Sequence, residues 1–580
     1  MSNNSKEKGT NENGNTISRR GFLKKSMLLS GSTGLTLLGG GTVAGLFQSC
    51  TKKEKFDTII ANGLIYCGDG KKPINGSIGI KEGKITAIGD LGDLDDLKSN
   101  YKTVIDALGH AVSPGFIDIH THSDTNFFNA PLGDSRIYQG ITTDVGGNCG
   151  DSPFPYSDEQ YEAKKGTLRY GYPYWQDIEG FYNALEKNKI GINYMSYVGF
   201  GMIRSAVIGK NNVQPNADQL KKMCSILDKE MEHGAVGMSC GLEYTPDAYA
   251  STDEIAELCK IVAKHNGLFA IHMRNEDDRV EEAITEAITI AKKANVRLQI
   301  SHLKAQNEPN WNKLPNMLKL IDEAKASGID IAFDRYPYVA FSTGLTSFIP
   351  TDLRQGSSEE ILARLKDPKI SAQIGKYSDS RVARLGGPQN VLIAACSNPD
   401  NAKYSGKNIA ECCKISGMEP WEMIKYLLVS ENLGVQMAGF AMKEENLQSI
   451  YAHPLSMPAS DGSVYSPEGP LGKEMPHPRS YGTFPRFLGK YCREDKIIDW
   501  STAIYKCTGL PASRLQLKDR GLISLGYAAD IVVFDKDKIK DSADYINPHQ
   551  FADGIEHVFV NGDHTIENKK FIGQLNGKIL

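Results

Sequence analysis

One short segment carries the clearest structural signal in the sequence: Gly115-Phe116-Ile117-Asp118-Ile119-His120-Thr121-His122-Ser123-Asp124. Its apolar part is typical of a buried strand, and that strand ends in two histidines separated by one residue. Side chains two residues apart on a strand point to the same face, so His120 and His122 can bind one cation together. A His-x-His pair alone is weak evidence for a metal site, because most such histidines are ordinary surface or core residues. Its meaning depends on the neighbouring strands.

Apolar runs alternate with amphipathic helical patterns from this segment to about residue 459. Repeated strand-then-helix order with apolar strands favours a parallel sheet covered by helices. Eight such strands within about 350 residues predict an α/β fold of the (β/α)8 TIM-barrel type with insertions. The predicted strands are Phe116–Ile119, Thr142–Val145, Asn193–Gly199, Val236–Ser239, Leu268–Ile271, Arg297–Ile300, Ile329–Phe333 and Leu455–Ala459.

Metal-binding side chains follow five of the eight predicted strands. In a (β/α)8 barrel the C-terminal ends of the strands form the face that carries the active site. Ligands that are far apart in the sequence therefore converge there. A thiolate combined with imidazoles favours Zn²⁺ over Mg²⁺ or Ca²⁺. The sequence predicts a zinc centre with the candidate ligands His120, His122, Cys149, His272, His302 and Asp461.

The sequence is rich in β-hairpin signals just after residue 56 and again near its C-terminus, whereas the segment between them is not. This pattern predicts a small β-sandwich assembled from residues 56–111 and 515–580, around a barrel that spans residues 112–514. A long stretch between the seventh and eighth strands contains helical patterns of its own. It predicts a helical insertion at about residues 351–453, acting as a lid or a subdomain.

Residues 1–50 are typical of an export signal. The segment Ser18-Arg19-Arg20-Gly21-Phe22-Leu23-Lys24 resembles the twin-arginine signal and precedes a moderately apolar run. Cys50 stands where a bacterial lipoprotein is cleaved and acylated, although Phe47 and Gln48 fit that pattern imperfectly. We therefore expect an exported bacterial protein, periplasmic or anchored to the membrane through a lipid on Cys50.

The composition restricts the kind of partner. The 580 residues include 66 Lys+Arg and 70 Asp+Glu, which gives a net charge of −4. Nucleic-acid-binding proteins usually carry a basic excess, so no nucleic-acid partner is expected. The near-neutral balance suits an enzyme of small molecules, with contact to a membrane only through the N-terminal lipid. The oligomeric state stays open.

Several segments near the strand ends share a pattern with one group of enzymes. They resemble the amidohydrolase superfamily and, within it, the N-acyl-D-amino-acid deacylase (D-aminoacylase) family. The resemblance runs from about Phe56 to the C-terminus, and Asn148-Cys149-Gly150 is its most specific part. Hydantoinase-like and dihydroorotase-like relatives use a carboxylated lysine as the bridging ligand, whereas this family uses a cysteine. The matching segments are Gly115–Asp124, Gly140–Gly150, Ile271–Glu276, Ile300–Lys304, Tyr336–Tyr338, Ser460–Gly462 and His477–Arg486.

The resemblance implies a zinc-dependent enzyme that hydrolyses the amide bond of N-acyl-D-amino acids. It implies one tight zinc site at Cys149, His272 and His302, and a second, weaker site at His120, His122 and Asp461. Amide hydrolysis also needs a group that takes a proton from water and returns it to the leaving amine, and Asp461 is the candidate. The residues expected to bind the substrate are Tyr244, Lys304, Tyr336, Ser342 and Arg479.

Two other functions remain open at this point. A related amidohydrolase would act on a cyclic amide or on a dipeptide that contains a D-residue. A zinc-binding lipoprotein would capture acylated amino acids without turnover, which the presence of Asp461 argues against. Phe200 and Phe341 stand where many relatives have His and Gly, respectively, so the preferred substrate side chain stays undetermined.

Overall fold

The computed structural model describes residues 56–580. The predicted export segment, residues 1–50, lies outside these residues, so export and lipidation at Cys50 stay predictions. Among the helices of residues 56–580, none combines the length and the apolar character needed to cross a membrane.

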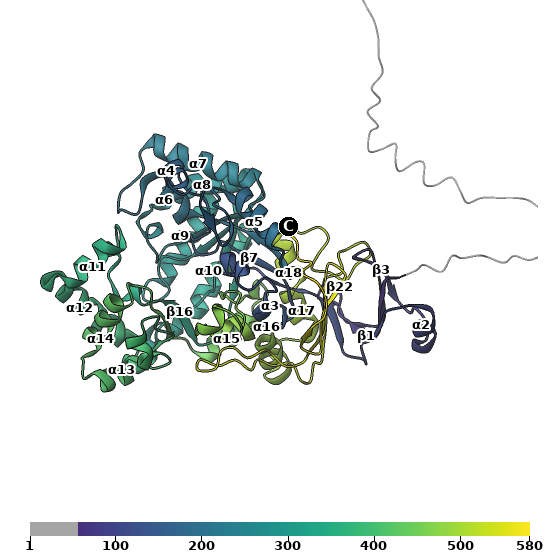
Figure 1. Ribbon diagram of the computed structural model, residues 1–580. Coiled ribbons are helices and arrows are strands. Elements are labelled where there is room, and N and C mark those ends of the chain that lie inside the picture. The colour runs from purple at the N-terminus through teal and green to yellow at the C-terminus, as the bar shows by residue number, and fades with distance from the viewer. Residues whose placement is uncertain (1–55) are drawn as a thin grey trace, which may run out of the picture. The chain divides into compact units, whose positions relative to one another are not determined.

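A parallel barrel forms the centre of the described chain (Figure 1), as predicted. Hydrogen bonds close it between the first and last strands, because the His122 amide donates to the Gly462 carbonyl at 2.8 Å and the Asp461 amide to the His120 carbonyl at 2.9 Å. All other neighbouring strands pair in parallel. In order around the barrel, the strands are β6 (Phe116–Asp118), β7 (Ile141–Gly146), β10 (Asn193–Ser196) continuing as β11 (Val198–Gly199), β12 (Gly237–Gly241), β13 (Leu268–His272), β14 (Arg297–Ile300), β15 (Ile331–Arg335) and β19 (Ser456–Pro458).

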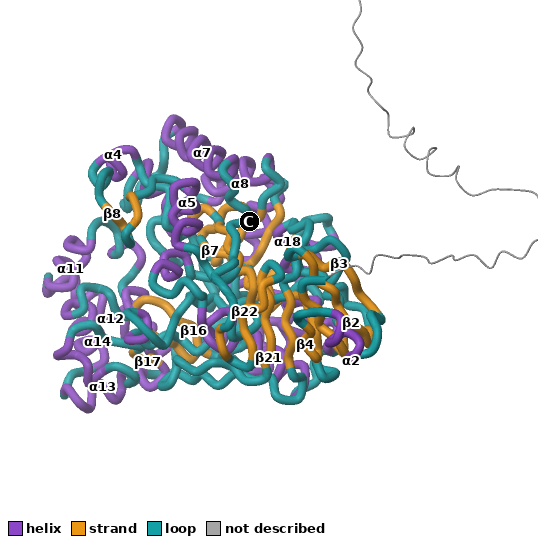
Figure 2. The backbone as a smooth tube through the Cα atoms, turned by 45° about the vertical axis from the view of Figure 1, so that its right-hand side comes forward, coloured by secondary structure: helices purple, strands orange, loops and turns teal. Residues whose placement is uncertain are grey.

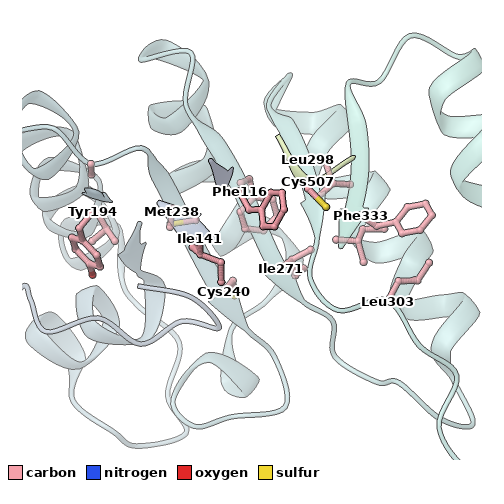
Figure 3. Close-up of a cluster of buried hydrophobic side chains, with 14 of the residues drawn as sticks. Phe116, Ile141, Tyr194, Met238, Cys240, Ile271, Leu298, Leu303, Phe333 and Cys507 are labelled. Atoms are coloured by element: carbon pink, nitrogen blue, oxygen red, sulfur yellow. The ribbon is translucent and has the colours of Figure 1, made fainter. Parts of the chain in front are cut away.

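The continuous apolar runs are explained by two separate cores. In β13, Leu268 and Ala270 belong to a cluster inside the barrel, whereas Phe269 and Ile271 belong to the cluster beneath the helices. Successive side chains of a strand point to opposite faces, so a strand buried on both faces must be apolar throughout. Figure 3 shows part of the outer cluster, including Phe116, Ile141, Met238, Ile271 and Phe333.

Amphipathic helices cover the barrel. In α7 (Ala217–Glu232), the Asn216 side chain accepts a hydrogen bond from the Gln219 amide, and Gln219 returns a bond in a capping box. Met223, Leu227 and Met231 recur at helical spacing and are buried on one face of this helix. Buried residues recur at the same helical spacing in the other covering helices. These include α5 (Ile178–Asn188), α8 (Thr252–Lys264), α9 (Val280–Ala294) and α10 (Leu314–Ala326).

The two ends of the described chain meet in a nine-stranded sheet (Figure 2). Its central pairing joins β5 to β20 in antiparallel fashion, with Ala111 opposite Phe534. In place of two stacked sheets, the predicted sandwich is one continuous sheet. The sheet curls, since β3 at its edge approaches the segment before β20, where the Ile85 amide donates to the Tyr527 carbonyl at 2.9 Å. Its strands are β1 (Thr58–Ile65), β2 (Ile74–Lys81), β3 (Lys84–Gly89), β4 (Val104–Asp106), β5 (Ala111–Pro114), β20 (Ile531–Phe534), β21 (Ile555–Val560), β22 (Asp563–Glu567) and β23 (Lys570–Phe571).

The insertion forms a unit with its own hydrophobic core. It lies on the opposite side of the barrel from β3 in both views (Figures 1 and 2). It starts earlier than the predicted residue 351, because β16 (Ala340–Gly344) pairs with β18 rather than with the barrel. Besides β16, it contains α11 (Ser358–Lys366), α12 (Pro368–Arg384), β17 (Val391–Ile393), α13 (Ile409–Ser416), α14 (Pro420–Ser430) and β18 (Gln436–Phe440).

Candidate metal centre

The six predicted ligands converge at the C-terminal ends of the barrel strands. The Cys149 Sγ atom lies 3.4 Å from His120 Nε2, 3.8 Å from His272 Nδ1 and 3.6 Å from His302 Nε2. The donor atoms fall into two groups that share Cys149: one also contains His272 and His302, and the other also contains His120, His122 and Asp461. In the second group, Asp461 Oδ1 lies 3.1 Å from His122 Nε2 and 3.4 Å from His120 Nε2.

Three of these side chains are held by unusual backbone geometry. The φ angles of Cys149, His302 and Asp461 are 53°, 36° and 50°, in the left-handed region that residues other than glycine rarely adopt. Gly150 follows at 81°, and a Cβ atom there would lie 2.0 Å from a carboxylate oxygen of Asp247. Strained conformations persist where the surrounding structure enforces them, typically at functional sites. Here they place the shared Cys149 beside one donor of each group, His302 and Asp461.

The buried groups stabilise each other's charged forms. Burial alone would raise the pKa of the Cys149 thiol, but the charge and hydrogen bond of His120 hold that pKa well below its ordinary value. Burial would lower the pKa of His120, but the charges of Cys149, Asp334 and Asp461 raise it well above its ordinary value. A metal ion bound here takes the place of these protons, because its ligands must be a thiolate, neutral imidazoles and carboxylates.

Three carboxylates that the sequence reasoning missed lie beside the histidines, and two of them, Asp334 and Glu276, are close enough to orient the rings. Asp334 Oδ1 lies 3.1 Å from His120 Nδ1, and Glu276 Oε1 lies 3.0 Å from His302 Nδ1. Glu243 Oε2 lies 3.8 Å from His272 Nε2. Such outer carboxylates fix the orientation of ligating histidines. Asp334 directly follows the seventh predicted strand, so the same inspection of strand ends would have found it.

The predicted substrate-binding residues line the same cavity, which has a volume of about 1220 Å³. All predicted site residues except the fully buried His120 contribute to its wall. The Tyr244 hydroxyl lies 3.3 Å from Thr343 Oγ1, and the buried Tyr336 hydroxyl has no hydrogen-bond partner among the described residues. Ser342 lies on β16, so the insertion contributes to the wall.

The two predicted cations are not free. Arg479 Nη1 donates to Asp461 Oδ2 at 2.6 Å, and Lys304 Nζ lies 2.5 Å from Glu276 Oε1. Each cation therefore already has a carboxylate partner beside the donor cluster. Their roles toward the substrate stay predictions, and the structure adds a second role for Arg479, which is to fix the Asp461 carboxylate.

The donor set fits a divalent metal ion. A tetrahedral ion with ordinary zinc bond lengths separates nitrogen and sulfur ligands by roughly 3.3–3.6 Å. In the group with Cys149, His272 and His302, the donor atoms are 2.9–3.8 Å apart. Barrel and site together define a metal-dependent hydrolase, because the metal ligands, a carboxylate and a cavity lie together at the end of the barrel where such enzymes carry their active sites.

Comparison with known proteins gives the family. The profile of the amidohydrolase family matches residues 103–566. A D-aminoacylase from Alcaligenes xylosoxydans is 32% identical over 92% of this chain and 99% of its own length. The crystal structure of an N-acyl-D-glutamate deacylase from Bordetella bronchiseptica, complexed with zinc and a phosphonate inhibitor that mimics the tetrahedral intermediate, has a TM-score of 0.76 and 30% identity. It covers 91% of this chain and 100% of its own.

A further solved structure concerns the metal centre itself. It is a D-aminoacylase with a binuclear centre, described by one-metal activation and second-metal attenuation. Its TM-score is 0.74 and its identity 31%, over 90% of this chain and 99% of its own. The chain belongs to the amidohydrolase family.

Proposed function

We propose that the protein is a zinc-dependent N-acyl-D-amino-acid deacylase, which releases a carboxylate and a free D-amino acid. The observation that carries this proposal is the sharing of Cys149 between two groups of donors. The similar D-aminoacylase and N-acyl-D-glutamate deacylase support the linear amide and the D configuration. The thiolate and imidazole donors support zinc.

We propose that the tight site comprises Cys149, His272 and His302, and that the weaker site comprises His120, His122 and Asp461. The first group offers a thiolate and two imidazoles, and Glu276 holds the imidazole of His302 at 3.0 Å. In the second group, the Asp461 carboxylate is shared with Arg479, which reduces its negative charge toward a cation. The one-metal activation described for the similar D-aminoacylase is consistent with unequal sites.

The mechanism assigns the proton transfers to Asp461. When bound, the metal would polarise the substrate carbonyl and lower the pKa of water. Burial would raise the pKa of Asp461, but the Arg479 guanidinium and the charges of His302 and His120 hold it well below its ordinary value. The ionised carboxylate accepts a proton from the attacking water and returns it to the leaving amine. Arg479 Nη1 occupies Oδ2, and Oδ1 lies 3.1 Å from His122 Nε2 within the second group of donors.

The α-carboxylate of the substrate requires a cation and hydroxyl groups. Arg479 has donors left beyond Nη1, and its guanidinium lies over the Tyr336 ring at 4.9 Å from the centroid. Arginine binds carboxylates through two parallel hydrogen bonds. We therefore propose Arg479 as the main carboxylate ligand, supported by Lys304 and by the hydroxyls of Tyr244, Tyr336 and Ser342 on the cavity wall.

A hydrolysis panel tests the proposed reaction. We expect release of the free amino acid from N-acetyl-D-amino acids and at least about 10²-fold lower kcat/KM for their L-enantiomers, because the two enantiomers cannot both align carboxylate and amide in one site. Release is measured by chiral chromatography. Hydantoins are assayed in parallel, because an enzyme of cyclic amides would hydrolyse them instead. Turnover of L-substrates alone, or of hydantoins alone, would contradict the proposal.

Two further arginines in the cavity wall point to an acidic substrate. Arg354 and Arg381 line the cavity, and each has a buried Nε with no hydrogen-bond partner. Among the described residues, neither guanidinium is ion-paired with a carboxylate, although the charge of Arg381 lowers the pKa of Glu243. Both arginines are half-buried, and an unpaired cation that is partly removed from water favours an anionic ligand group beside it. We propose that they bind a side-chain carboxylate, as in N-acyl-D-glutamate or N-acyl-D-aspartate.

The variant Arg381→Met tests this preference. We expect kcat/KM for N-acetyl-D-glutamate to fall about 10- to 100-fold, the usual value of a hydrogen bond to a charged group. The kcat/KM for N-acetyl-D-methionine should change by less than about threefold, because its side chain carries no charge that could pair with an arginine. Lys376→Met is the matched control, since Lys376 is exposed on the same helix, α12, and is not part of the cavity wall. Equal losses for both substrates would contradict the acidic preference.

A further inference from the structure

A second cluster of metal-binding side chains lies in the terminal sheet, away from the barrel strands. His557 is on β21, and His564 and Glu567 are on β22, the next strand of the same hairpin (Figure 2). His557 Nδ1 lies 3.1 Å from His564 Nε2, and donor atoms of all three residues lie within 4.8 Å of one another. None of them belongs to the catalytic centre.

The strand register explains why they meet. His557 stands directly opposite Glu567, and Phe559 stands opposite His564. A bulge between Val558 and Phe559 shifts the register, so that both β22 residues reach the face that carries His557. The opposite face of the hairpin carries Val558 and Ile566, which are buried in the main core.

The packing of this hairpin therefore fixes the three side chains without closing the site. All three residues are half-buried, which leaves room for an ion to enter. The His564 ring is stacked on Phe559, with centroids 4.5 Å apart and an interplanar angle of 15°. This contact holds one imidazole in place before any ligand binds.

The charge state also suits a cation. Burial lowers the pKa of both His557 and His564, and the charge of His564 lowers that of His557 further. A neutral imidazole is the form that binds metals. Among the described residues, the Glu567 carboxylate has no hydrogen-bond or ion-pair partner. A hydrogen bond between the two rings would satisfy one nitrogen of each and leave this carboxylate unused.

We propose that His557, His564 and Glu567 form a separate site for a borderline divalent cation such as Zn²⁺, Ni²⁺ or Cu²⁺. Two imidazoles and one carboxylate favour these ions over Mg²⁺ and Ca²⁺. Because the ligands come from two adjacent strands, the ion joins β21 to β22 and stabilises the folded hairpin. The site is independent of hydrolysis, since none of its residues lines the catalytic cavity.

Calorimetric titration with Ni²⁺ tests the site on the whole protein, which first receives one equivalent of Zn²⁺, so that the tight catalytic site is filled and the hairpin site stays open. We expect about one Ni²⁺ per chain for the unaltered protein, and at least about 10-fold weaker binding for His564→Gln, since even residues that only support a ligand change affinity by 10- to 100-fold. The kcat/KM of hydrolysis should be the same in both proteins. His233→Gln is the matched control, because His233 is a partly buried histidine that belongs to none of the described groups of metal-binding side chains.

Glu567→Gln is the second variant, because it keeps the side-chain shape and the His557–His564 contact. We expect it to bind Ni²⁺ at least about 10-fold more weakly and to lose the rise in unfolding temperature that Ni²⁺ gives the unaltered protein. Unchanged Ni²⁺ affinity in both variants would overturn the proposal. So would the absence of a bound Ni²⁺ in the unaltered protein, which would leave the two histidines as a hydrogen-bonded pair only.

Discussion

Replacing Cys149 by serine is expected to remove tightly bound metal and hydrolytic activity together. The thiolate belongs to both groups of donors, so its loss affects both candidate metal positions. A serine hydroxyl stays protonated and is a poor zinc ligand, whereas the pKa of the Cys149 thiol is held well below its ordinary value. Because metal catalysis supplies several kcal/mol of transition-state stabilisation, we expect kcat/KM to fall by at least about 10³-fold.

The measurement pairs metal content by plasma mass spectrometry with kcat/KM on an N-acetyl-D-amino acid. Cys224→Ser is the control, because Cys224 is a half-buried cysteine on α7, outside both groups of donors. It should keep both the metal and the activity. If Cys149→Ser kept full activity without bound metal, hydrolysis would not depend on the metal and the proposed mechanism would be wrong. Circular dichroism on the same samples separates loss of the site from loss of the fold.

Replacing Asp461 by asparagine should separate metal binding from turnover. We expect the tight metal at Cys149, His272 and His302 to be retained, because Asp461 belongs to the other group. The amide keeps the size of the carboxylate but cannot accept a proton, so kcat should fall about 10²- to 10⁴-fold, the usual contribution of a general acid–base group. KM should change much less, since Arg479 remains in place for the substrate carboxylate.

The distinguishing measurement for Asp461→Asn is kcat together with metal content. Asp277→Asn serves as the control, because Asp277 is another carboxylate on the cavity wall that pairs with Arg384 rather than with the metal ligands. Its kcat should stay within about threefold. If Asp461→Asn kept an unchanged rate, the base would have to be another group.

The barrel and its six ligand candidates could be predicted from the sequence because both depend on local patterns. Strands buried on both faces read as apolar runs, and the residue after each run lies at the C-terminal face. Glu276 and Asp334 obey the same rule, since one follows His272 by four residues and the other directly follows a predicted strand. They were missed because carboxylates at strand ends are ambiguous without their partners.

The pairing of charged groups could not be predicted in this way. Lys304 and Arg479 were expected only as substrate ligands, and their carboxylate partners could not be foreseen because these come from other strands and loops. Arg354 and Arg381 reach the cavity only because the insertion folds as its own unit beside the barrel face. Its placement depends on tertiary packing, as does the early start of its sheet at Ala340.

The shared terminal sheet has a consequence for how the chain folds. Its central pair places Ala111 of β5 opposite Phe534 of β20. These two strands must therefore pair although the entire barrel lies between them in the sequence. Such long-range pairing makes folding slow, because a very large loop must be closed before its contacts form. Until then, β5 and β20 present open edges to other chains. We therefore expect aggregation during refolding to begin at these two strands, and a chaperone to be most useful before the last strands are in place.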